Sequence, residues 1–147
     1  MEIAILGLGC FWGPEIKFSK LDGVIKTEVG YCGGNSSETT YKDVCTGITN
    51  HAEVVKLDFD PKIISYEKIL KYFFEIHDPT TLNSQGPDFG TQYRSEIFYL
   101  NDQQKEISEK VIQEENIKFS GKIVTKISLV KNYCPAEEYH QKYLEKR

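Results

Sequence analysis

The sequence predicts a two-layer α+β sandwich around a mixed or antiparallel sheet, folded as a single domain over residues 1–147. Three observations support this fold class. The chain of 147 residues can bury a real core and fits one domain, with no internal repeat or low-complexity linker. Some segments have the apolar or alternating patterns typical of strands, and other segments repeat apolar residues at helical spacing. These segments do not follow the strict strand–helix alternation of a parallel sheet.

Five segments are expected to form strands. EIAILGL is an apolar run that ends near a glycine. In VIKTEV, Val, Lys and Glu alternate with Ile, Thr and Val, and in AEVVKLDF the apolar Val55, Leu57 and Phe59 alternate with Lys56 and Asp58. EIFYL and GKIVTKISLV have a similar composition. The expected strands are 2–8, 24–29, 52–59, 96–100 and 121–130.

Four segments are expected to form helices. Pro14 suits a first helical turn, and Ser65 precedes apolar residues at helical spacing, as a capping residue does. Asn101 with Gln104 resembles a capping box. The expected helices are 14–21, 66–76, 101–117 and the terminal segment 136–147.

Two segments lack usable periodicity. GYCGGNSSETT, residues 30–40, has the composition of a loop, and residues 77–95 form a second, longer irregular stretch. A loop of that length inside a compact domain is usually functional.

Composition limits the classes of partner. The chain carries 18 basic and 22 acidic residues, a net charge of −4, with no long run of either sign. This balance argues against nucleic acid or an anionic membrane as the main partner. No apolar stretch approaches the length of a membrane span, and no basic region followed by an apolar signal core opens the chain. We therefore expect a cytoplasmic protein.

The four cysteines, at positions 10, 32, 45 and 134, lack the short spacings of zinc ribbons and thioredoxin-like pairs. The three histidines are scattered, so no metal site is expected. In a reducing cytosol the thiols are expected to be free at rest, and any disulfide would be transient.

Cys10 is the first candidate for chemistry. It lies in GLGCFWGPEIKF, where a strand ends and a helix begins, so helix N–H groups and the helix dipole favour its thiolate. Phe11 and Trp12, the only tryptophan, follow it in a tight turn and suggest a wall for a ligand. The alternative for Cys10 is a small buried hydrophobe at a turn.

Glu53 is the second candidate. In an alternating strand it shares a face with Val55, Leu57 and Phe59, which is the buried side. Partial desolvation there raises the pKa of a carboxyl and lets it hold a proton near neutral pH. The alternative is a frayed strand end in solvent. Three residues in or beside irregular segments are weaker candidates: Tyr41, Asp88 and Tyr93. Amphipathic packing explains most tyrosines in a chain of this kind.

Six motifs in order along the chain resemble one family, the peptide methionine sulfoxide reductases of the A type. The resemblance covers nearly the whole chain. The motifs are GCFWG at 9–13, GY-x-GG at 30–34, TYKDVCTG at 40–47, HAEVV at 51–55, GTQYRS at 90–95 and AEEYHQKY at 136–143.

The resemblance implies thiol-dependent reduction of methionine S-sulfoxide, free or in proteins, and repair of oxidised proteins. Cys10 is then the nucleophile that attacks sulfur, and Glu53 is the acid that protonates the oxygen. The products are methionine and a sulfenic acid on Cys10. Other residues match positions that hold substrate: Phe11 and Trp12 line a pocket for its methyl group, Tyr41 and Tyr93 hydrogen-bond the oxygen, Asp88 supports the site, and Tyr143 lies near the pocket.

The resemblance also implies a ferredoxin-like sandwich with long coil segments, no bound cofactor, and an external thiol reductant such as thioredoxin. Many relatives carry recycling cysteines after the terminal helix, and this sequence reaches Arg147 without one. We expect an internal disulfide partner for Cys10, either Cys32 in its Gly-rich loop or Cys134 before Pro135; direct attack by an external thiol is the alternative. Cys45 is interpreted as a packed thiol.

Two other function classes fit the same residues. A cysteine hydrolase would acylate Cys10 with a histidine as base, although no histidine has an evident partner. A non-enzymatic module would bind oxidised methionine without converting it.

Overall fold

The computed structural model describes residues 1–146 and contains a mixed sheet of six strands in the order β7-β6-β1-β3-β2-β8. All neighbouring strands are antiparallel except β6 and β7, which are parallel. The strands are β1 (Glu2–Leu8), β2 (Val24–Cys32), β3 (Ala52–Phe59), β6 (Ser95–Tyr99), β7 (Lys126–Leu129) and β8 (Cys134–Pro135). A separate hairpin joins β4 (Ser84–Gln85) to β5 (Asp88–Phe89). The fold class is therefore α+β, as predicted.

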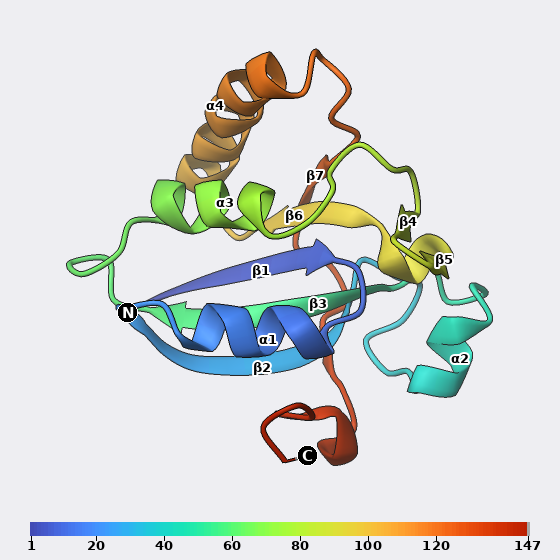
Figure 1. The fold of residues 1–147 in the computed structure, drawn as a ribbon. Coiled ribbons are helices and arrows are strands. Elements are labelled where there is room, and N and C mark those ends of the chain that lie inside the picture. Colours follow the sequence, from blue (N-terminus) through green and yellow to red (C-terminus); the bar gives the residue numbers. More distant parts are fainter. Residues whose placement is uncertain (147) are drawn as a thin grey trace.

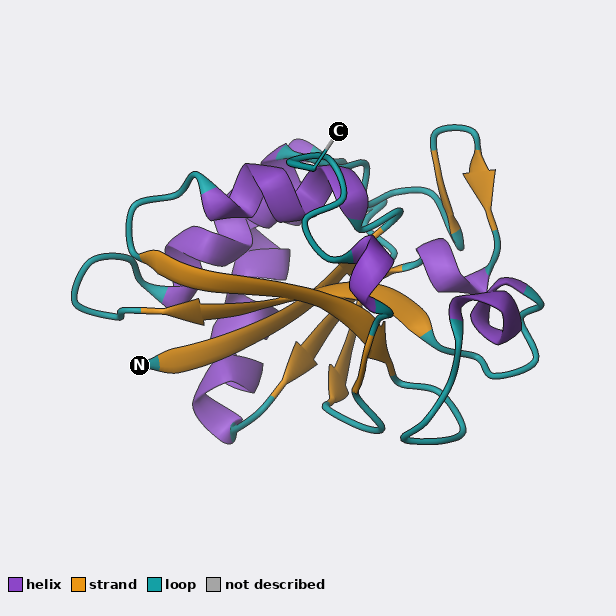
Figure 2. Ribbon diagram, turned by 90° about the horizontal axis from the view of Figure 1, so that it is seen from below, coloured by secondary structure: helices purple, strands orange, loops and turns teal. Residues whose placement is uncertain are grey.

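The described residues 1–146 form four α-helices and two short 3-10 helices in addition to the strands. The helices are α1 (Trp12–Ser19), α2 (Tyr41–Cys45), α3 (Tyr66–Glu75) and α4 (Asp102–Lys118), with short 3-10 helices at η1 (Thr91–Tyr93) and η2 (Glu138–His140). The main core lies between the sheet and α1 and α3, where Phe18, Leu57 and Phe73 belong to one cluster of buried side chains. Figure 1 shows α2 and the β4–β5 hairpin beyond the end of β1, and Figure 2 shows them at the end of the sheet opposite the N-terminus.

Capping residues explain where two helices begin. The side chain of Ser65 accepts from the N–H of Lys68, and that of Asn101 accepts from the N–H of Gln104, as the sequence predicts. Helix α1 begins at Trp12, earlier than expected. Pro14 is tolerated there because N–H groups of a first turn have no helical partner.

Three elements differ from their expected form. Strand β2 continues to Cys32, because Tyr31 pairs with Glu53 on one side and with Cys134 on the other. Within 121–130, only β7 is a strand. The irregular stretch 77–95 includes the hairpin and η1.

The expected terminal helix over 136–147 is wrong for the described residues, which form η2 followed by turns. The side chain of Gln141 bonds to both the N–H and the carbonyl of Val29, which holds the segment along β2. Lys142 has a φ of 52°, a left-handed conformation that a helix does not allow.

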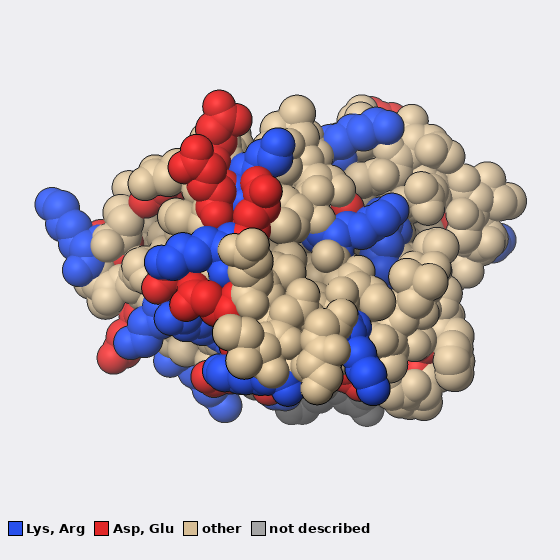
Figure 3. Space-filling view, turned by 90° about the horizontal axis from the view of Figure 1, so that it is seen from above, with Lys and Arg blue, Asp and Glu red and all other residues tan. Residues whose placement is uncertain are grey.

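No helix within residues 1–146 has the length and apolar character needed to cross a membrane. Figure 3 views the molecule from above, and over part of this face acidic and basic side chains are intermingled.

Candidate active site

Cys10 lies in the turn between β1 and α1, with its side chain partly buried. Gly9 before it has a φ of 100°, and a Cβ there would lie 2.8 Å from the side chain of Gln85. Glycine is therefore required at this position for two reasons, conformation and space.

The pKa of Cys10 is raised to about 11. Burial is the main cause, and the carboxyls of Glu53 and Asp88 add to it, while a hydrogen bond from the backbone N–H of Trp12 opposes it. The expected helix-terminus stabilisation of the thiolate is present but is outweighed by burial. The resting residue is thus a thiol, although the sequence suggested that the start of the helix favours the thiolate.

Glu53 is almost completely buried, with 1% of its surface exposed. The backbone N–H of Phe11 donates to its Oε1 at 3.3 Å, and its Oε2 has no hydrogen-bond partner among residues 1–146. Burial and the nearby Asp88 raise the pKa of Glu53 to about 8, against the opposing bond from Phe11. The prediction of a desolvated carboxyl on the buried strand face is confirmed.

Two phenols from separate elements face this carboxyl. Tyr41 opens α2, whose N-cap Thr40 accepts from the N–H of Asp43, and Tyr93 ends η1. Their hydroxyls lie near each other, and burial and the carboxyl of Glu53 raise the pKa of both. Both groups are therefore neutral donors at physiological pH.

Asp88, the first residue of β5, completes the cluster from the hairpin. Its charge acts on the titration of Cys10, Glu53 and Tyr93. The structure therefore brings together all five of the residues that the sequence suggested for chemistry, from the turn after β1 and from α2, β3, β5 and η1.

The aromatic residues of the turn have different surroundings. Phe11 is 1% exposed and belongs to the core, with its ring 5.8 Å from that of Tyr31. Trp12 is half-buried and stacks on Tyr143 with ring centres 3.9 Å apart and planes 14° apart. Phe11 is thus core, contrary to the first interpretation of the turn, while Trp12 and Tyr143 form a stacked pair that reaches the surface.

Comparison with known proteins identifies the family. The family profile "Peptide methionine sulfoxide reductase" matches residues 2–147. A curated "Peptide methionine sulfoxide reductase MsrA" from Pelagibacter ubique is 83% identical over 147 residues, covering 100% of both chains. The chain belongs to the A-type peptide methionine sulfoxide reductases.

Solved structures of the yeast member of the family resemble this fold. The reduced form of Mxr1 from Saccharomyces cerevisiae has a TM-score of 0.95 and 43% identity, covering 99% of this chain and 85% of that one. Mxr1 in complex with Trx2 gives a TM-score of 0.69 and 29% identity, covering 97% and 84%.

The remaining thiols of this family member lie in three different settings. Cys32 is fully buried on the opposite face of the sheet from Tyr31 and Glu53, and its Sγ donates to the carbonyl of Lys131 at 3.3 Å. Cys134 faces the same side as Tyr31, with its Sγ 3.8 Å from the carbonyl of Thr39. Cys45 is exposed and lies near the hydroxyl of Tyr41, so its interpretation as a packed thiol is wrong.

Strand order limits which thiol can reach Cys10. Cys134 in β8 is separated from Glu53 in β3 by two strand spacings, which is about 10 Å. Cys10 follows β1, which lies on the other side of β3 from β8. A disulfide needs Cα atoms within about 7 Å, so Cys134 requires backbone movement to reach Cys10.

Three residues of the AEEYHQKY segment have contacts at this site that the sequence did not assign. His140 accepts a hydrogen bond from the indole of Trp12 at 3.0 Å. Glu137 accepts from the hydroxyl of Tyr31 at 2.8 Å and from the N–H of Tyr41 at 2.9 Å. Gln141 holds the segment to β2. The sequence contained an indication of these contacts, because the AEEYHQKY motif is rich in polar residues. It was interpreted as a terminal helix, and only Tyr143 was placed near the pocket.

No group of three or more His, Cys, Asp or Glu side chains in the described part of the chain, residues 1–146, could hold a metal ion. The five residues of the cluster offer the thiol of Cys10, the carboxyls of Glu53 and Asp88, and two phenols.

Proposed function

We propose that Cys10 and Glu53 carry out the reduction of methionine S-sulfoxide, free or in proteins, to methionine. The observation that carries this proposal is a thiol beside a buried carboxyl whose pKa, raised to about 8, keeps it protonated at neutral pH. Oxide is a poor leaving group, so a nucleophile that attacks the sulfoxide sulfur needs a proton donor at the oxygen.

Each residue of the cluster has one role in this step. The sulfur of Cys10 bonds to the substrate sulfur, and Glu53 gives its proton to the oxygen. The hydroxyls of Tyr41 and Tyr93 donate hydrogen bonds to that oxygen as it gains negative charge, and Asp88 supports the site. Trp12 and Tyr143, with Phe11 behind them, form the apolar side that takes the substrate methyl group.

The protons and electrons of the step balance. After the Cys10 sulfur has bonded to the substrate sulfur and the oxygen is protonated, the S–O bond breaks, the hydroxyl passes to the Cys10 sulfur and the bond between the two sulfurs is released. The sulfoxide sulfur is thereby reduced by two electrons to methionine, and Cys10 is oxidised by two electrons to a sulfenic acid. Glu53 first gives its own proton to the oxygen. It then takes up the proton that the Cys10 thiol loses. A thiol with a pKa of about 11 is therefore compatible with the reaction, because no net proton is needed.

The sulfenic acid needs an external thiol reductant, and the proposed partner is a thioredoxin, as in the complex of yeast Mxr1 with Trx2. The site is proposed to need no bound cofactor. We also propose that residues 1–147 act as one catalytic domain in the cytoplasm. The succession β1-α1-β2-β3-α3-β6, with adjacent strands in the order β6-β1-β3-β2, supports the ferredoxin-like assignment.

The test is incubation with each methionine sulfoxide epimer and dithiothreitol, followed by measurement of methionine. The S epimer is expected to be reduced, and Cys10→Ser is expected to lose all detectable activity while remaining folded. Equal turnover of both epimers, or of neither, contradicts the proposal. Ester or amide cleavage without reductant indicates a hydrolase, and binding without turnover indicates a binding module.

A further inference from the structure

We propose that neutral His140 is the positioning residue that holds the Trp12 indole beside Cys10. This inference rests on the proposed function for its kinetic consequence. Its structural part, a hydrogen bond between the side chains of Trp12 and His140, can be tested without substrate.

The hydrogen bond fixes the protonation state of the imidazole. Nε1 of the Trp12 indole lies 3.0 Å from Nδ1 of His140. An indole N–H can only donate, so Nδ1 must carry no proton and the proton of the neutral ring is on Nε2. Nε2 is buried and has no partner among residues 1–146. The one bond that His140 makes through its ring nitrogens in this part of the chain is therefore the one to Trp12.

Aromatic rings surround His140 on several sides. Its ring centre lies 5.3 Å from that of Phe11, 4.5 Å from that of Tyr41 and 4.3 Å from that of Tyr139. Only 2% of its surface is exposed. The imidazole thus lies between the turn that carries the thiol and the helix that carries a site phenol.

The segment that carries His140 is anchored by the two residues that directly follow it. Gln141 accepts from the N–H of Val29 at 2.9 Å and donates to its carbonyl at 2.8 Å. The N–H of Lys142 donates to Oε1 of Glu15 in α1 at 2.7 Å. Because Trp12 is in the same helix as Glu15, one anchor sets the distance between imidazole and indole.

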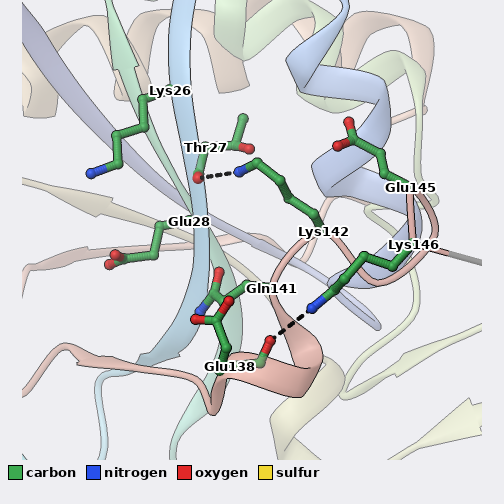
Figure 4. Close-up of a pocket in the computed structure, with 8 residues that line it drawn as sticks. All are labelled: Lys26, Thr27, Glu28, Glu138, Gln141, Lys142, Glu145 and Lys146. Carbon is green, nitrogen blue, oxygen red and sulfur yellow. Dashed lines mark hydrogen bonds between the residues drawn. The ribbon is translucent and has the colours of Figure 1, made fainter.

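Figure 4 shows two further contacts of the terminal segment, at a cavity of about 470 Å³ between β2 and this segment. Nζ of Lys142 reaches the carbonyl of Thr27 at 3.4 Å, and Nζ of Lys146 reaches that of Glu138 at 3.0 Å. These contacts hold the segment and take no part in the thiol chemistry.

The charged and titratable groups that face His140 are few. Glu137 on its own segment favours the protonated ring, and the phenols of Tyr41 from α2 and Tyr139 are neutral neighbours. From α1 it meets the uncharged Trp12, with Phe11 just before that helix. Burial outweighs Glu137 and lowers the pKa of His140 below 6.5, so the ring is neutral at pH 7.

Protonation breaks the contact. In the imidazolium form Nδ1 becomes a donor that faces the indole N–H, so the bond to Trp12 is lost. Trp12 is then free to rotate away from Tyr143, and the apolar side of the site loses its fixed position.

Trp12 is the only tryptophan, so indole emission reports on the surroundings of this one side chain, and variants of His140 identify the part that depends on the imidazole. The experiment compares the wild type with His140→Asn, whose side-chain oxygen can accept near the position of Nδ1, and with His140→Leu, which has no acceptor. Emission is recorded without substrate from pH 8 to pH 4. The wild-type emission is expected to titrate below pH 6.5, and that transition is expected to be absent from both variants.

At pH 7.5 the emission and KM of His140→Asn are expected to resemble the wild type. His140→Leu is expected to differ in emission and to raise KM about fivefold, the scale of one lost hydrogen bond, with a smaller change in kcat. A wild-type emission that does not titrate, a transition retained in His140→Asn, or an unchanged KM in a folded His140→Leu overturns the proposal. Absence of reductase activity with a titrating emission overturns the proposed function instead and leaves the hydrogen bond intact.

Discussion

The backbone N–H of Phe11 donates to Oε1 of Glu53 at 3.3 Å, across 42 positions of sequence. This bond ties the turn that carries Cys10 to the buried face of β3. It occupies one carboxyl oxygen and leaves Oε2 without a partner within residues 1–146. The thiol and the acid are therefore positioned by the same contact, and the unpartnered oxygen is the one placed to act on a ligand.

Removal of the acid tests the chemical step. Glu53→Gln keeps the size of the side chain and loses the acidic proton, so we expect sulfenic acid formation in a single turnover to slow by about 10²–10⁴-fold. Substrate affinity is expected to change much less. Glu115→Gln is a matched control, since Glu115 is also buried but pairs with Lys118 in α4. A normal single-turnover rate in Glu53→Gln excludes Glu53 as the acid.

The same substitution has a consequence for stability. The pKa of Glu53 is about 8 in the folded protein, above its ordinary value of 4.5. The folded state thus prefers the protonated carboxyl, and this contribution is complete below pH 4.5 and is lost as the pH rises through 8. Glutamine does not titrate, so Glu53→Gln is expected to gain stability relative to the wild type over this range.

Chemical denaturation at several pH values measures that difference. The gain is expected to reach a few kcal/mol and to level off above pH 8, because one pKa unit corresponds to about 1.4 kcal/mol. A difference in the free energy of unfolding that stays constant from pH 4.5 to pH 9 contradicts the raised pKa of Glu53.

The indole is expected to act in binding. Trp12→Ala removes the ring that stacks on Tyr143, so we expect a rise in KM of about tenfold or more, on the scale of a lost buried aromatic contact. The control is Leu129→Ala, an exposed apolar residue of β7 at the far edge of the sheet. If Trp12→Ala lowers the single-turnover rate at saturating substrate and leaves KM unchanged, the ring acts in chemistry and not in binding.

Recycling of Cys10 is expected to avoid Cys32. That thiol lies on the opposite face of the sheet, so Cys32→Ser is expected to leave turnover with dithiothreitol or thioredoxin unchanged. After one equivalent of substrate without reductant, we expect two of the four thiols to remain, with peptide mapping assigning the partner of Cys10 to Cys134 or to the exposed Cys45. Three remaining thiols with a dimedone-reactive Cys10, or a disulfide to Cys32, contradict this expectation.

Several features followed from short-range patterns alone. The alternation in AEVVKLDF placed Glu53 on the face of Val55 and Leu57, and all three are buried. Ser65 and Asn101 marked helix starts through side-chain caps that the structure contains. These features depend on neighbours two to four positions away, and the sequence displays such neighbours directly.

Other features depended on which distant segments meet. Helix-dipole reasoning favoured a thiolate at Cys10, whereas burial in the folded chain raises its pKa. The segment after Ala136 has a helical composition but follows β2, because Gln141 bonds to Val29, 112 positions away. The exposure of Cys45 and the contact of His140 with Trp12 were hidden for the same reason. The sequence by itself determined which residues could act and which face each presents. Tertiary structure decided their burial and partners, because desolvation and long-range hydrogen bonds depend on the whole chain.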